Sequence, residues 1–517
     1  MSLSGQRAGR ARRWAASLAL VAAASSCATG LGQAAEGPAT TRASDRTTTT
    51  GASNRTTTTA GDSTTTTAPD DDPLGGFQPD PPSWSDCGRG AECATLAVPL
   101  DWEDPDGDTI DLALSRDPAS GDRAGAVLVN PGGPGGSGTD MVGGVFVGPR
   151  FDDLTQRFDV VGWDPRGTND SEPISCDDNV DELQALDPSP DDAAEQAALE
   201  DAAAEVAADC ERQAGDRLAH VSTHETVLDM EAIRRALGDE QLTYYGFSYG
   251  TALGSFYADE FPDRVRAIVL DGVVDPDADL EEFLVAQTRG FEDSLDAMFE
   301  ACGSSCPTGG ADALYDRLAA QVERKPLGAG DRTLGPAELA VAAISATYTP
   351  DSGPRFIAAM EDADDGDPDA LLGIADDYYS AVDFTPYLAI ECIDQPHPEG
   401  FEAWQAFVTR LEEVSPRLGG SIGNELLPCA DWPVDVQRTP TFPTATGSDA
   451  ILVIGNTGDA ATPFAQAETM AERLDNAVLV THEGTGHTSY GNPCVDEITA
   501  AYLVDLKLPD EGTTCSD

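Results

Sequence analysis

One short stretch of the sequence, residues 243–251, reads TYYGFSYGT and decides how the rest is interpreted. In it an apolar segment leads into the pattern Gly-x-Ser-x-Gly around Ser248, and a helix-like segment, Ala252 to Phe261, follows. Glycines two positions before and after a serine permit the sharp strand-to-helix turn that exposes a nucleophilic hydroxyl. The alternative is a glycine-rich turn whose serine has no task. The strand before the turn and the helix after it favour Ser248 as a nucleophile.

Short apolar segments on both sides of this turn predict a mostly parallel sheet. The first two, Thr95 to Pro99 and Thr109 to Arg116, alternate like an antiparallel pair around a turn-rich loop. The others are nearly continuously apolar, which is typical of buried parallel strands; they are residues 126–130, 159–163, 242–246, 267–271, 451–454 and 478–481. In such sheets functional residues collect in the loops after the carboxyl ends of the strands.

A nucleophilic serine needs a base, and the sequence has only 5 histidines. His487 lies in a glycine-rich loop after the last apolar segment. In catalytic triads of serine, acid and histidine that are built on such a sheet, the histidine base lies at this position. The acid that orients the base is expected between the serine and the histidine in chain order. Asp459, after the penultimate strand, has the favoured position, and Asp271 and Asp275 after the preceding strand are its rivals.

A glycine-rich loop, residues 130–138, leaves an earlier strand and reads NPGGPGGSG. Backbone N–H groups that no side chain obstructs can stabilise the negative charge that develops on a carbonyl oxygen. We predict that Gly133, or Gly132 in its place, and Tyr249 supply these oxyanion donors. The loop also fits Gly-x-Gly-x-x-Gly, with Asp164 ending the next strand, which is a dinucleotide-binding pattern. That alternative leaves the serine turn and the histidine loop unexplained.

These motifs, in this order, resemble the secreted bacterial tripeptidyl-aminopeptidase-like serine peptidases, which are related to prolyl aminopeptidases. The matching stretches are residues 96–102, 131–138, 163–167, 246–251 and 263–276, together with the loops of Asp459 and His487. The resemblance covers about residues 87 to 517. It implies an α/β-hydrolase fold and a serine exopeptidase. One departure is Asn169, where relatives often carry glycine.

Residues 277–433 interrupt the sheet pattern, and their apolar positions recur at helical spacing. We predict that they form a helical lid inserted after the sixth core strand, between two parts of the core, residues 87–276 and 434–517. A lid over the serine would exclude long chains. The resemblance implies that acidic lid residues hold the substrate ammonium, which makes Glu391 and Asp394 candidates. The alternative is that they are ordinary surface carboxylates.

The first 27 residues are typical of a targeting segment, because four arginines precede an apolar run from Trp14 to Ala24. That run is too short to span a membrane as a helix. Residues 24–27 resemble a lipobox in which Cys27 would carry a lipid, and cleavage near Ala34 is the alternative. Residues 28–86 are rich in Thr, Ser and Pro and predict a disordered tether. We therefore expect a protein that is secreted or anchored to the outer face of the membrane.

Of the 11 cysteines, all but Cys27 lie beyond the predicted leader, where an exported chain forms disulfides. The sequence does not fix their pairing. The simplest pairing is sequential: Cys87 with Cys93, Cys176 with Cys210, Cys302 with Cys306, Cys392 with Cys429, and Cys494 with Cys515. A zinc site is not expected, because there is no Cys-x-x-Cys pair and no histidine at ligand spacing from a cysteine pair.

The chain carries 92 acidic and 30 basic side chains, for a formal net charge of −62. This charge repels phosphate backbones and anionic lipids, so nucleic-acid binding is excluded. Only Lys325 and Lys507 are lysines, and this depletion together with the carboxylate excess suits concentrated salt. A genome of high GC content is the alternative cause.

Three functions stay open. The main hypothesis is an aminopeptidase that cleaves peptide substrates through an acyl-enzyme and needs no metal or cofactor. The second is a carboxylesterase with the same machinery and small ester substrates, and the third is an envelope protein whose hydrolase fold serves only for binding. The complete set of Ser248, Asp459 and His487 argues against the third. No motif in the sequence indicates whether peptides or esters are preferred, or what the oligomeric state is.

Overall fold

The computed structural model describes residues 72–516, except 177–178, 304–305, 331, 382 and 438–440. The predicted targeting segment, Cys27 and most of the predicted tether therefore lie outside the described residues. The last part of that tether differs from the prediction. Leu74 is fully buried against the core, and Phe77 packs edge-on against Trp102 with ring centroids 5.5 Å apart. Because these apolar side chains find partners, the folded part begins before the predicted boundary at residue 87.

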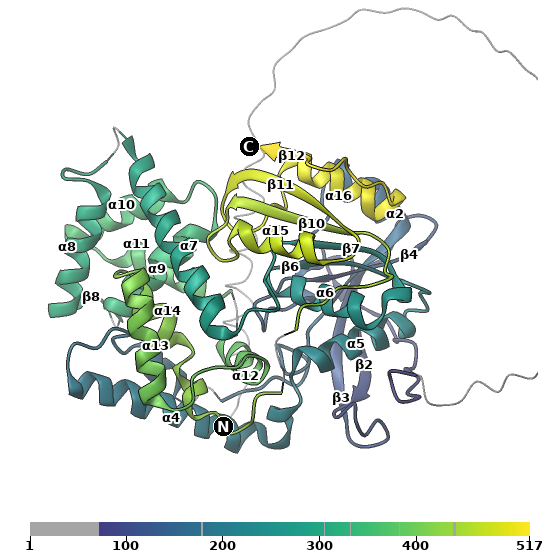
Figure 1. Cartoon of the computed structure of the whole chain (residues 1–517), viewed down its shortest axis with the longest axis horizontal. Helices are drawn as coiled ribbons and strands as arrows, with labels where there is room; N and C mark the ends of the chain where they lie inside the picture. Colours follow the sequence, from purple (N-terminus) through teal and green to yellow (C-terminus); the bar gives the residue numbers. More distant parts are fainter. Residues whose placement is uncertain are drawn as a thin grey trace, which may run out of the picture. The chain divides into compact units, whose positions relative to one another are not determined.

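In the described part of the chain, a 10-stranded sheet has the order β1-β2-β3-β5-β4-β6-β7-β10-β11-β12 (Figure 1). The strands are β1 (Ser85–Gly88), β2 (Ala91–Pro99), β3 (Thr109–Asp117), β4 (Gly125–Asn130), β5 (Phe158–Trp163), β6 (Leu242–Phe247), β7 (Val265–Asp271), β10 (Ile451–Gly458), β11 (Ala477–Thr485) and β12 (Thr514–Ser516). The first three pair antiparallel, β3 is antiparallel to β5, and all later pairs are parallel.

The mostly parallel sheet is thus confirmed, and every predicted strand lies within an observed one. The edge strands β1 and β12 were not predicted, because short and mostly exposed strands carry no continuous apolar pattern. Each face of the sheet packs on its own group of helices. Helices α5 (Thr223–Ala236), α6 (Tyr249–Glu260) and α15 (Phe464–Arg473) cover one face, and α2 (Asp152–Arg157) and α16 (Pro493–Asp505) cover the other.

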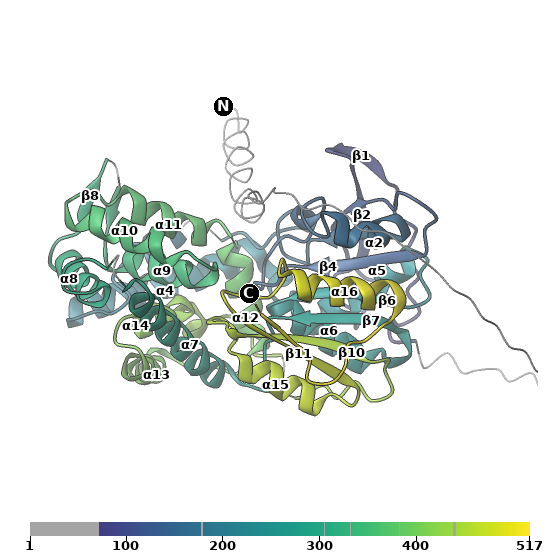
Figure 2. The ribbon, with the colours of Figure 1, turned by 90° about the horizontal axis from the view of Figure 1, so that it is seen from above.

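Between β7 and β10 the chain forms a mostly helical segment, residues 277–433, which we call the lid. It contains α7 (Leu280–Ala301), α8 (Ala311–Arg324), a small hairpin of β8 (Leu327–Ala329) and β9 (Arg332–Leu334), α9 (Pro336–Tyr348), α10 (Gly353–Asp364), α11 (Asp369–Tyr379), α12 (Phe384–Asp394), α13 (Phe401–Val414) and α14 (Gly419–Glu425). Figures 1 and 2 both show these helices beside the sheet rather than on its faces.

The lid shares its core with a helix that the sequence did not predict. Helix α4 (Ala193–Ala214) lies with the short α3 (Val180–Gln184) between β5 and α5, and it places Leu199 and Val206 in the same apolar cluster as Trp404 of the lid. The part of the connection that contains α3 and α4 therefore packs with the lid helices, whereas α5, which follows it, covers the sheet. No helix of the described residues is long and apolar enough to cross a membrane.

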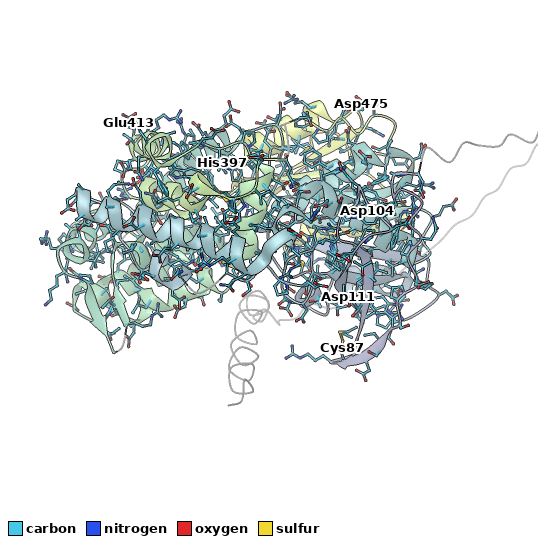
Figure 3. All side chains as sticks on the ribbon, turned by 90° about the horizontal axis from the view of Figure 1, so that it is seen from below. Cys87, Asp104, Asp111, His397, Glu413 and Asp475 are labelled. Atoms are coloured by element: carbon cyan, nitrogen blue, oxygen red, sulfur yellow. A yellow bond between two sulfur atoms is a disulfide. The ribbon has the colours of Figure 1, made fainter. Side chains whose placement is uncertain are left out.

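The five predicted disulfides are confirmed; they join Cys87 to Cys93, Cys176 to Cys210, Cys302 to Cys306, Cys392 to Cys429, and Cys494 to Cys515. The first joins β1 to β2 and is labelled at Cys87 in Figure 3. The same view shows charged side chains distributed over the surface, among them the exposed residues Asp104, Asp111, Glu413 and Asp475. The disulfides therefore join segments in both the core and the lid.

Candidate active site

Ser248 lies at the turn between β6 and α6, with φ 54° and ψ −127°. A positive φ is rare for a residue with a side chain and stores backbone strain. The flanking positions have no room for a side chain, because a Cβ on Gly246 would lie 2.3 Å from the carbonyl oxygen of Gly250. A Cβ on Gly250 would lie 2.9 Å from the carbonyl oxygen of Asn130. The turn thus has the geometry of a nucleophile elbow.

The His487 ring contacts the carboxylate of Asp459, with its Nδ1 atom 3.0 Å from Oδ1 and 2.9 Å from Oδ2. The Asp459 side chain is fully buried, and its oxygens also accept hydrogen bonds from the N–H groups of Ala461, Thr462 and Thr488. These donors fix the carboxylate. Of the three aspartates considered from the sequence, Asp459 is the one whose carboxylate hydrogen-bonds the His487 ring.

The chemical state of His487 suits a base. Burial of the ring opposes its charged form, but the Asp459 carboxylate and, less strongly, Asp271 outweigh this and raise the pKa of His487. Its Nε2 atom is buried and has no hydrogen-bond partner among the described residues. One nitrogen is therefore held by an acid, and the other is available for proton transfer.

The glycine-rich loop lies directly against the nucleophile turn. A Cβ on Gly132 would be 2.9 Å from both Ser248 Cβ and Tyr249 N. The Gly132 N–H donates to Asn130 Oδ1 at 2.9 Å and is therefore engaged within the loop. The Gly133 N–H, by contrast, has no acceptor within the described part of the chain. This favours Gly133 over Gly132 as the partner of Tyr249 in an oxyanion hole.

Asp164, which the dinucleotide alternative would use for a ribose, is committed within the protein. Its carboxylate accepts hydrogen bonds from the Ser137 hydroxyl at 2.8 Å, the Thr139 hydroxyl at 2.9 Å and the Asn169 side chain at 2.9 Å. Asn169 has a φ of 40°, in the left-handed region that glycine adopts most readily. This use of Asp164 argues against a dinucleotide site.

The lid approaches the catalytic loops at two places. A Cβ on Gly135 would lie 3.1 Å from the Tyr387 N atom of α12, so α12 packs against the glycine-rich loop. The Tyr348 carbonyl at the end of α9 accepts a hydrogen bond of 2.9 Å from the His487 N–H, and the two rings pack edge-on at 5.3 Å. Residues of the lid therefore contact both the glycine-rich loop and His487.

The two lid carboxylates that the sequence singled out have different surroundings. Asp394 is 4% exposed and accepts hydrogen bonds from the Thr223 N–H at 3.0 Å and from the Thr223 hydroxyl. That hydroxyl also bonds the hydroxyl of Tyr249, the residue after Ser248. Glu391 is half-buried, on the same helix as Tyr387. Asp394 thus links α12 to the start of α5, and its carboxylate already accepts hydrogen bonds from Thr223.

Glu425, the last residue of α14, is a lid acid that sequence reasoning missed. Its carboxylate accepts a hydrogen bond of 3.2 Å from the Tyr378 hydroxyl. Among the described residues no cationic group lies within ion-pair distance of it. Burial raises the pKa of Glu425 to about 7. The sequence indicates the burial of Glu425 only weakly, because Glu425 is the single charged residue in residues 418–430, LGGSIGNELLPCA.

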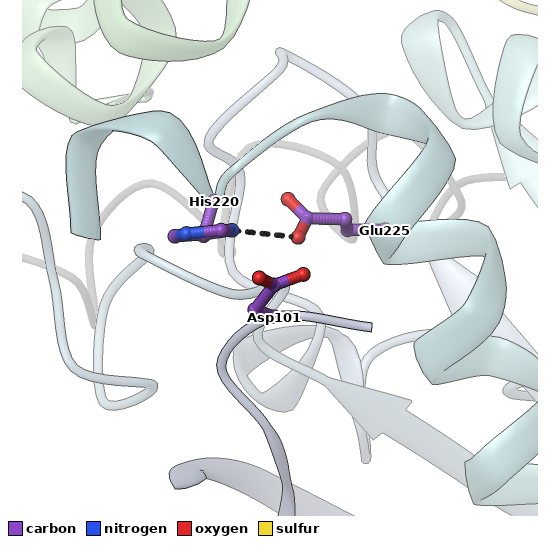
Figure 4. A group of neighbouring side chains, drawn as sticks. All are labelled: Asp101, His220 and Glu225. Carbon is purple, nitrogen blue, oxygen red and sulfur yellow. Dashed lines mark hydrogen bonds and ion pairs between the residues drawn. The ribbon is translucent and has the colours of Figure 1, made fainter. Parts of the chain in front are cut away.

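A second group of polar side chains, Asp101, His220 and Glu225, brings its potential ligand atoms within 4.8 Å of one another (Figure 4). His220 Nδ1 lies 3.0 Å from Glu225 Oε1. The fully buried guanidinium of Arg166 lies 3.4 Å from the same oxygen and forms an ion pair of 2.7 Å with Asp229. Because this positive charge already compensates the carboxylates and would repel a metal ion, the group is an ion-pair cluster at the start of α5.

The sheet order, the nucleophile turn and the His487–Asp459 pair define the class as α/β hydrolase. Residues 125–305 match the family model described as alpha/beta hydrolase fold, and residues 415–515 match the one described as TAP-like protein. The chain is 36% identical over 457 residues to serine protease Hip1 of Mycobacterium tuberculosis, covering 82% of this chain and 87% of that protein. The chain therefore belongs to the tripeptidyl-aminopeptidase-like α/β hydrolases, and it is a serine hydrolase.

Other relatives bear different names. Carboxylesterase B of Mycobacterium tuberculosis is 34% identical over 469 residues, covering 84% of this chain and 90% of that protein. Tripeptidyl aminopeptidase of Streptomyces lividans is 32% identical over 466 residues, covering 84% and 86%. Among solved structures, the proline iminopeptidase of Mycobacterium smegmatis is 14% identical with a TM-score of 0.31, covering 79% of this chain and 97% of that one.

Proposed function

We propose that this serine hydrolase is an aminopeptidase that releases residues or short peptides from free peptide N-termini. In the proposed reaction Ser248 attacks the scissile carbonyl, and His487 takes the hydroxyl proton through Nε2 and then passes it to the leaving amine. Asp459 holds the ring in the required tautomer and stabilises the imidazolium. The N–H groups of Gly133 and Tyr249 bind the oxyanion, and water then hydrolyses the acyl-enzyme.

The single observation that carries the exopeptidase proposal is the carboxylate of Glu425. A substrate with a free amino terminus brings an ammonium group, and Glu425 is an acid of the lid with no cation beside it among the described residues. A series of contacts connects it to the base: the Glu425–Tyr378 hydrogen bond of 3.2 Å, the Tyr378–Tyr348 ring contact of 6.1 Å and the Tyr348–His487 contact of 5.3 Å.

The surroundings of Glu425 support an ammonium ligand. Glu425 and Asn424 line a cavity of about 60 Å³ whose other walls are mostly apolar, including Leu186, Val341 and Tyr379. The Oδ1 atom of Asn424 is buried and has no hydrogen-bond partner among the described residues. Both polar atoms are acceptors, and an ammonium group has three donors and no acceptor. A charge-assisted hydrogen bond to Glu425 would therefore favour substrates with a free N-terminus.

Glu391 remains a proposed second anchor. Burial, Glu425 and Glu391 together raise the pKa of the Tyr387 hydroxyl, so both carboxylates act on the same tyrosine of α12. A substrate ammonium near Tyr387 would be attracted by both charges. For Asp394 we instead propose a structural role, because its oxygens bond Thr223.

The names of relatives support more than one substrate class. A tripeptidyl aminopeptidase and a serine protease favour peptides, whereas a relative named carboxylesterase B favours the alternative of small esters. The non-catalytic alternative is not pursued, because the chain is a serine hydrolase. We also propose that the protein works outside the cytoplasm, since its five disulfides persist in oxidising compartments. Mass spectrometry of the mature N-terminus would distinguish a lipidated Cys27 from cleavage near Ala34.

The experiment that tests the proposed function compares kcat/KM for free and N-acetylated peptide amides, together with short acyl esters, at low and high salt. The acidic surface attracts any cationic substrate, but salt screens that attraction, whereas it leaves a short buried contact intact. We expect a large preference for the free amino terminus that survives high salt. Equal rates on both amides, with faster turnover of the esters, would favour the carboxylesterase.

A further inference from the structure

Asp271, the last residue of β7, carries a buried carboxylate that the proposed mechanism does not use. It is 0% exposed. In the sheet it lies between Phe247 of β6 and Ile454 of β10. The proposed nucleophile follows β6 and the proposed acid follows β10, so Asp271 occupies the strand end between them.

Asp271 makes hydrogen bonds to the segments of both the nucleophile and the base. Its main-chain carbonyl accepts from the Ser248 N–H at 3.0 Å. Its carboxylate oxygen Oδ1 accepts from the Ser489 N–H at 2.9 Å, two residues beyond His487. The other carboxylate oxygen accepts from the buried Tyr245 hydroxyl at 2.8 Å, which fixes the orientation of the carboxylate. One residue therefore bonds the turn of Ser248 and the loop of His487 at the same time.

The residue after Asp271 lies directly beside the imidazole. Gly272 has a φ of +71°, and a Cβ at this position would lie 3.1 Å from the His487 Cε1 atom. The backbone that follows Asp271 is therefore in close contact with the ring. A shift of this strand end would move the Ser248 turn and the His487 ring relative to each other.

We propose that Asp271 is a positioning residue, which sets the distance between Ser248 and His487 and whose negative charge supports the imidazolium formed during the reaction. The inference rests on the roles proposed above for Ser248 and His487. It assigns to Asp271 a function that differs from that of Asp459, because its carboxylate bonds the Ser489 N–H and the Tyr245 hydroxyl rather than the His487 ring.

The electrostatic part of the proposal predicts a pH effect. Burial raises the pKa of Asp271 to about 7, and the charge of Asp459 acts in the same direction. The Tyr245 hydroxyl, the Ser489 N–H and His487 lower this pKa. The ionised carboxylate stabilises a protonated His487, and its removal should lower the pKa of His487. Because catalysis needs a neutral base, an uncharged residue at position 271 should shift the acid limb of the activity profile to lower pH.

The test uses the full-length protein and the variants Asp271→Ala, Asp271→Asn and Tyr245→Phe. Three quantities are measured from pH 5 to 9: kcat and KM on a peptide amide, and the rate at which diisopropyl fluorophosphate modifies Ser248. Asp159→Asn is the matched control, since Asp159 is also a buried strand aspartate but forms ion pairs with Arg116 and Arg123. Its pH profile should not change.

We expect Asp271→Ala to lower kcat and the modification rate about a hundredfold with KM nearly unchanged, as a misplaced base would. Asp271→Asn can still accept from Ser489, so it should recover to within about tenfold of the wild type, with its acid limb shifted to lower pH. Tyr245→Phe should lower kcat by less, because it removes one support of the carboxylate.

Two outcomes would overturn the proposal: variants with the rate and pH profile of the wild type, or equal losses in Asp271→Ala and Asp271→Asn without a shift of the acid limb. If Asp271→Ala does not fold, the profile of Asp271→Asn decides by the same criterion. Wild-type protein that is not modified at Ser248 would contradict the proposed function itself, whereas modified wild type with unaffected variants contradicts only the role of Asp271.

Discussion

The catalytic loops and the lid cavity differ in how their buried acceptors are satisfied. At the loops, the Asp459 carboxylate accepts three N–H hydrogen bonds besides its contact with His487. The Asp271 carboxylate accepts one from the Ser489 N–H and one from the Tyr245 hydroxyl. In the lid, Glu425 accepts from one tyrosine, and Asn424 Oδ1 has no partner among the described residues. A buried acceptor without a donor costs free energy. The acceptors at the loops thus already have donors from the protein, whereas in the lid cavity the ammonium group of the proposed substrate would supply donors that the described residues do not.

The largest effect is expected from Ser248→Ala, which removes the proposed nucleophile. We expect a loss of kcat of more than about a thousandfold, with an unchanged melting temperature because the hydroxyl contributes little packing. Steady-state kinetics and thermal unfolding measure the two quantities. Ser255→Ala, on the same helix, is the matched control and should keep its activity. Near-normal turnover of Ser248→Ala would eliminate this serine as the nucleophile.

The next effect concerns the lid. Glu425→Gln keeps the shape of the side chain but removes its charge, so KM for peptides with a free amino terminus should rise by about 10- to 100-fold. The rates on N-acetylated peptides and small esters should stay within about twofold, because these substrates cannot form the contact. Glu413→Gln, at an exposed lid position, is the matched control. A parallel change for free and blocked substrates would show that Glu425 only supports the fold.

The same carboxylate predicts how substrate preference depends on pH. Since burial raises the pKa of Glu425 to about 7, its negative charge is lost as the pH falls through that value. A peptide α-amino group loses its own charge above a pKa of about 7.7 to 8. The ratio of kcat/KM for free over acetylated peptide should therefore be greatest near pH 7 to 8 and fall on both sides. A ratio that is constant between pH 5 and 7 would contradict the assignment.

A smaller effect on activity is expected from the disulfide between Cys392 and Cys429, which lies in the lid near both proposed anchors. Replacing both cysteines by serine should destabilise the protein by about 2 to 5 kcal/mol and raise KM only a few-fold. Denaturant unfolding and steady-state kinetics measure these changes. The pair Cys494 and Cys515 is the control outside the lid; its removal should lower stability without raising KM. Native protein with free thiols at these positions would contradict the predicted oxidised state.

Local motifs made much of the core predictable. Gly246 and Gly250 mark the turn of Ser248, and buried parallel strands have continuous apolar runs that periodicity detects. Sequential pairing of cysteines also proved sufficient, because each partner lies in a nearby segment of the chain. Helix α4 was missed although Asp192 and Glu195 stand at the positions of an N-terminal cap, because its alanine-rich face gives a weak apolar pattern.

Residues whose role depends on tertiary packing were not predictable in the same way. Glu425 and Asp394 are both acids at the ends of lid helices, and the sequence gives no reason to separate them. Only packing shows that Asp394 receives the Thr223 N–H whereas Glu425 has no cation among the described residues. Likewise, Leu74 and Phe77 are isolated apolar residues in a polar segment, and their burial depends on partners far along the chain.

In the proposed function, Ser248 attacks a substrate whose amino terminus is bound in the lid. The most direct measurement is the inactivation rate by a peptidyl diphenyl phosphonate with a free or an acetylated N-terminus, combined with mass-spectrometric mapping of the adduct. We predict modification of Ser248 alone, at least about tenfold faster with the free amino terminus, and loss of that preference in Glu425→Gln but not in Glu413→Gln. An adduct at another residue, or equal rates for the two phosphonates on the wild type, would contradict the claim.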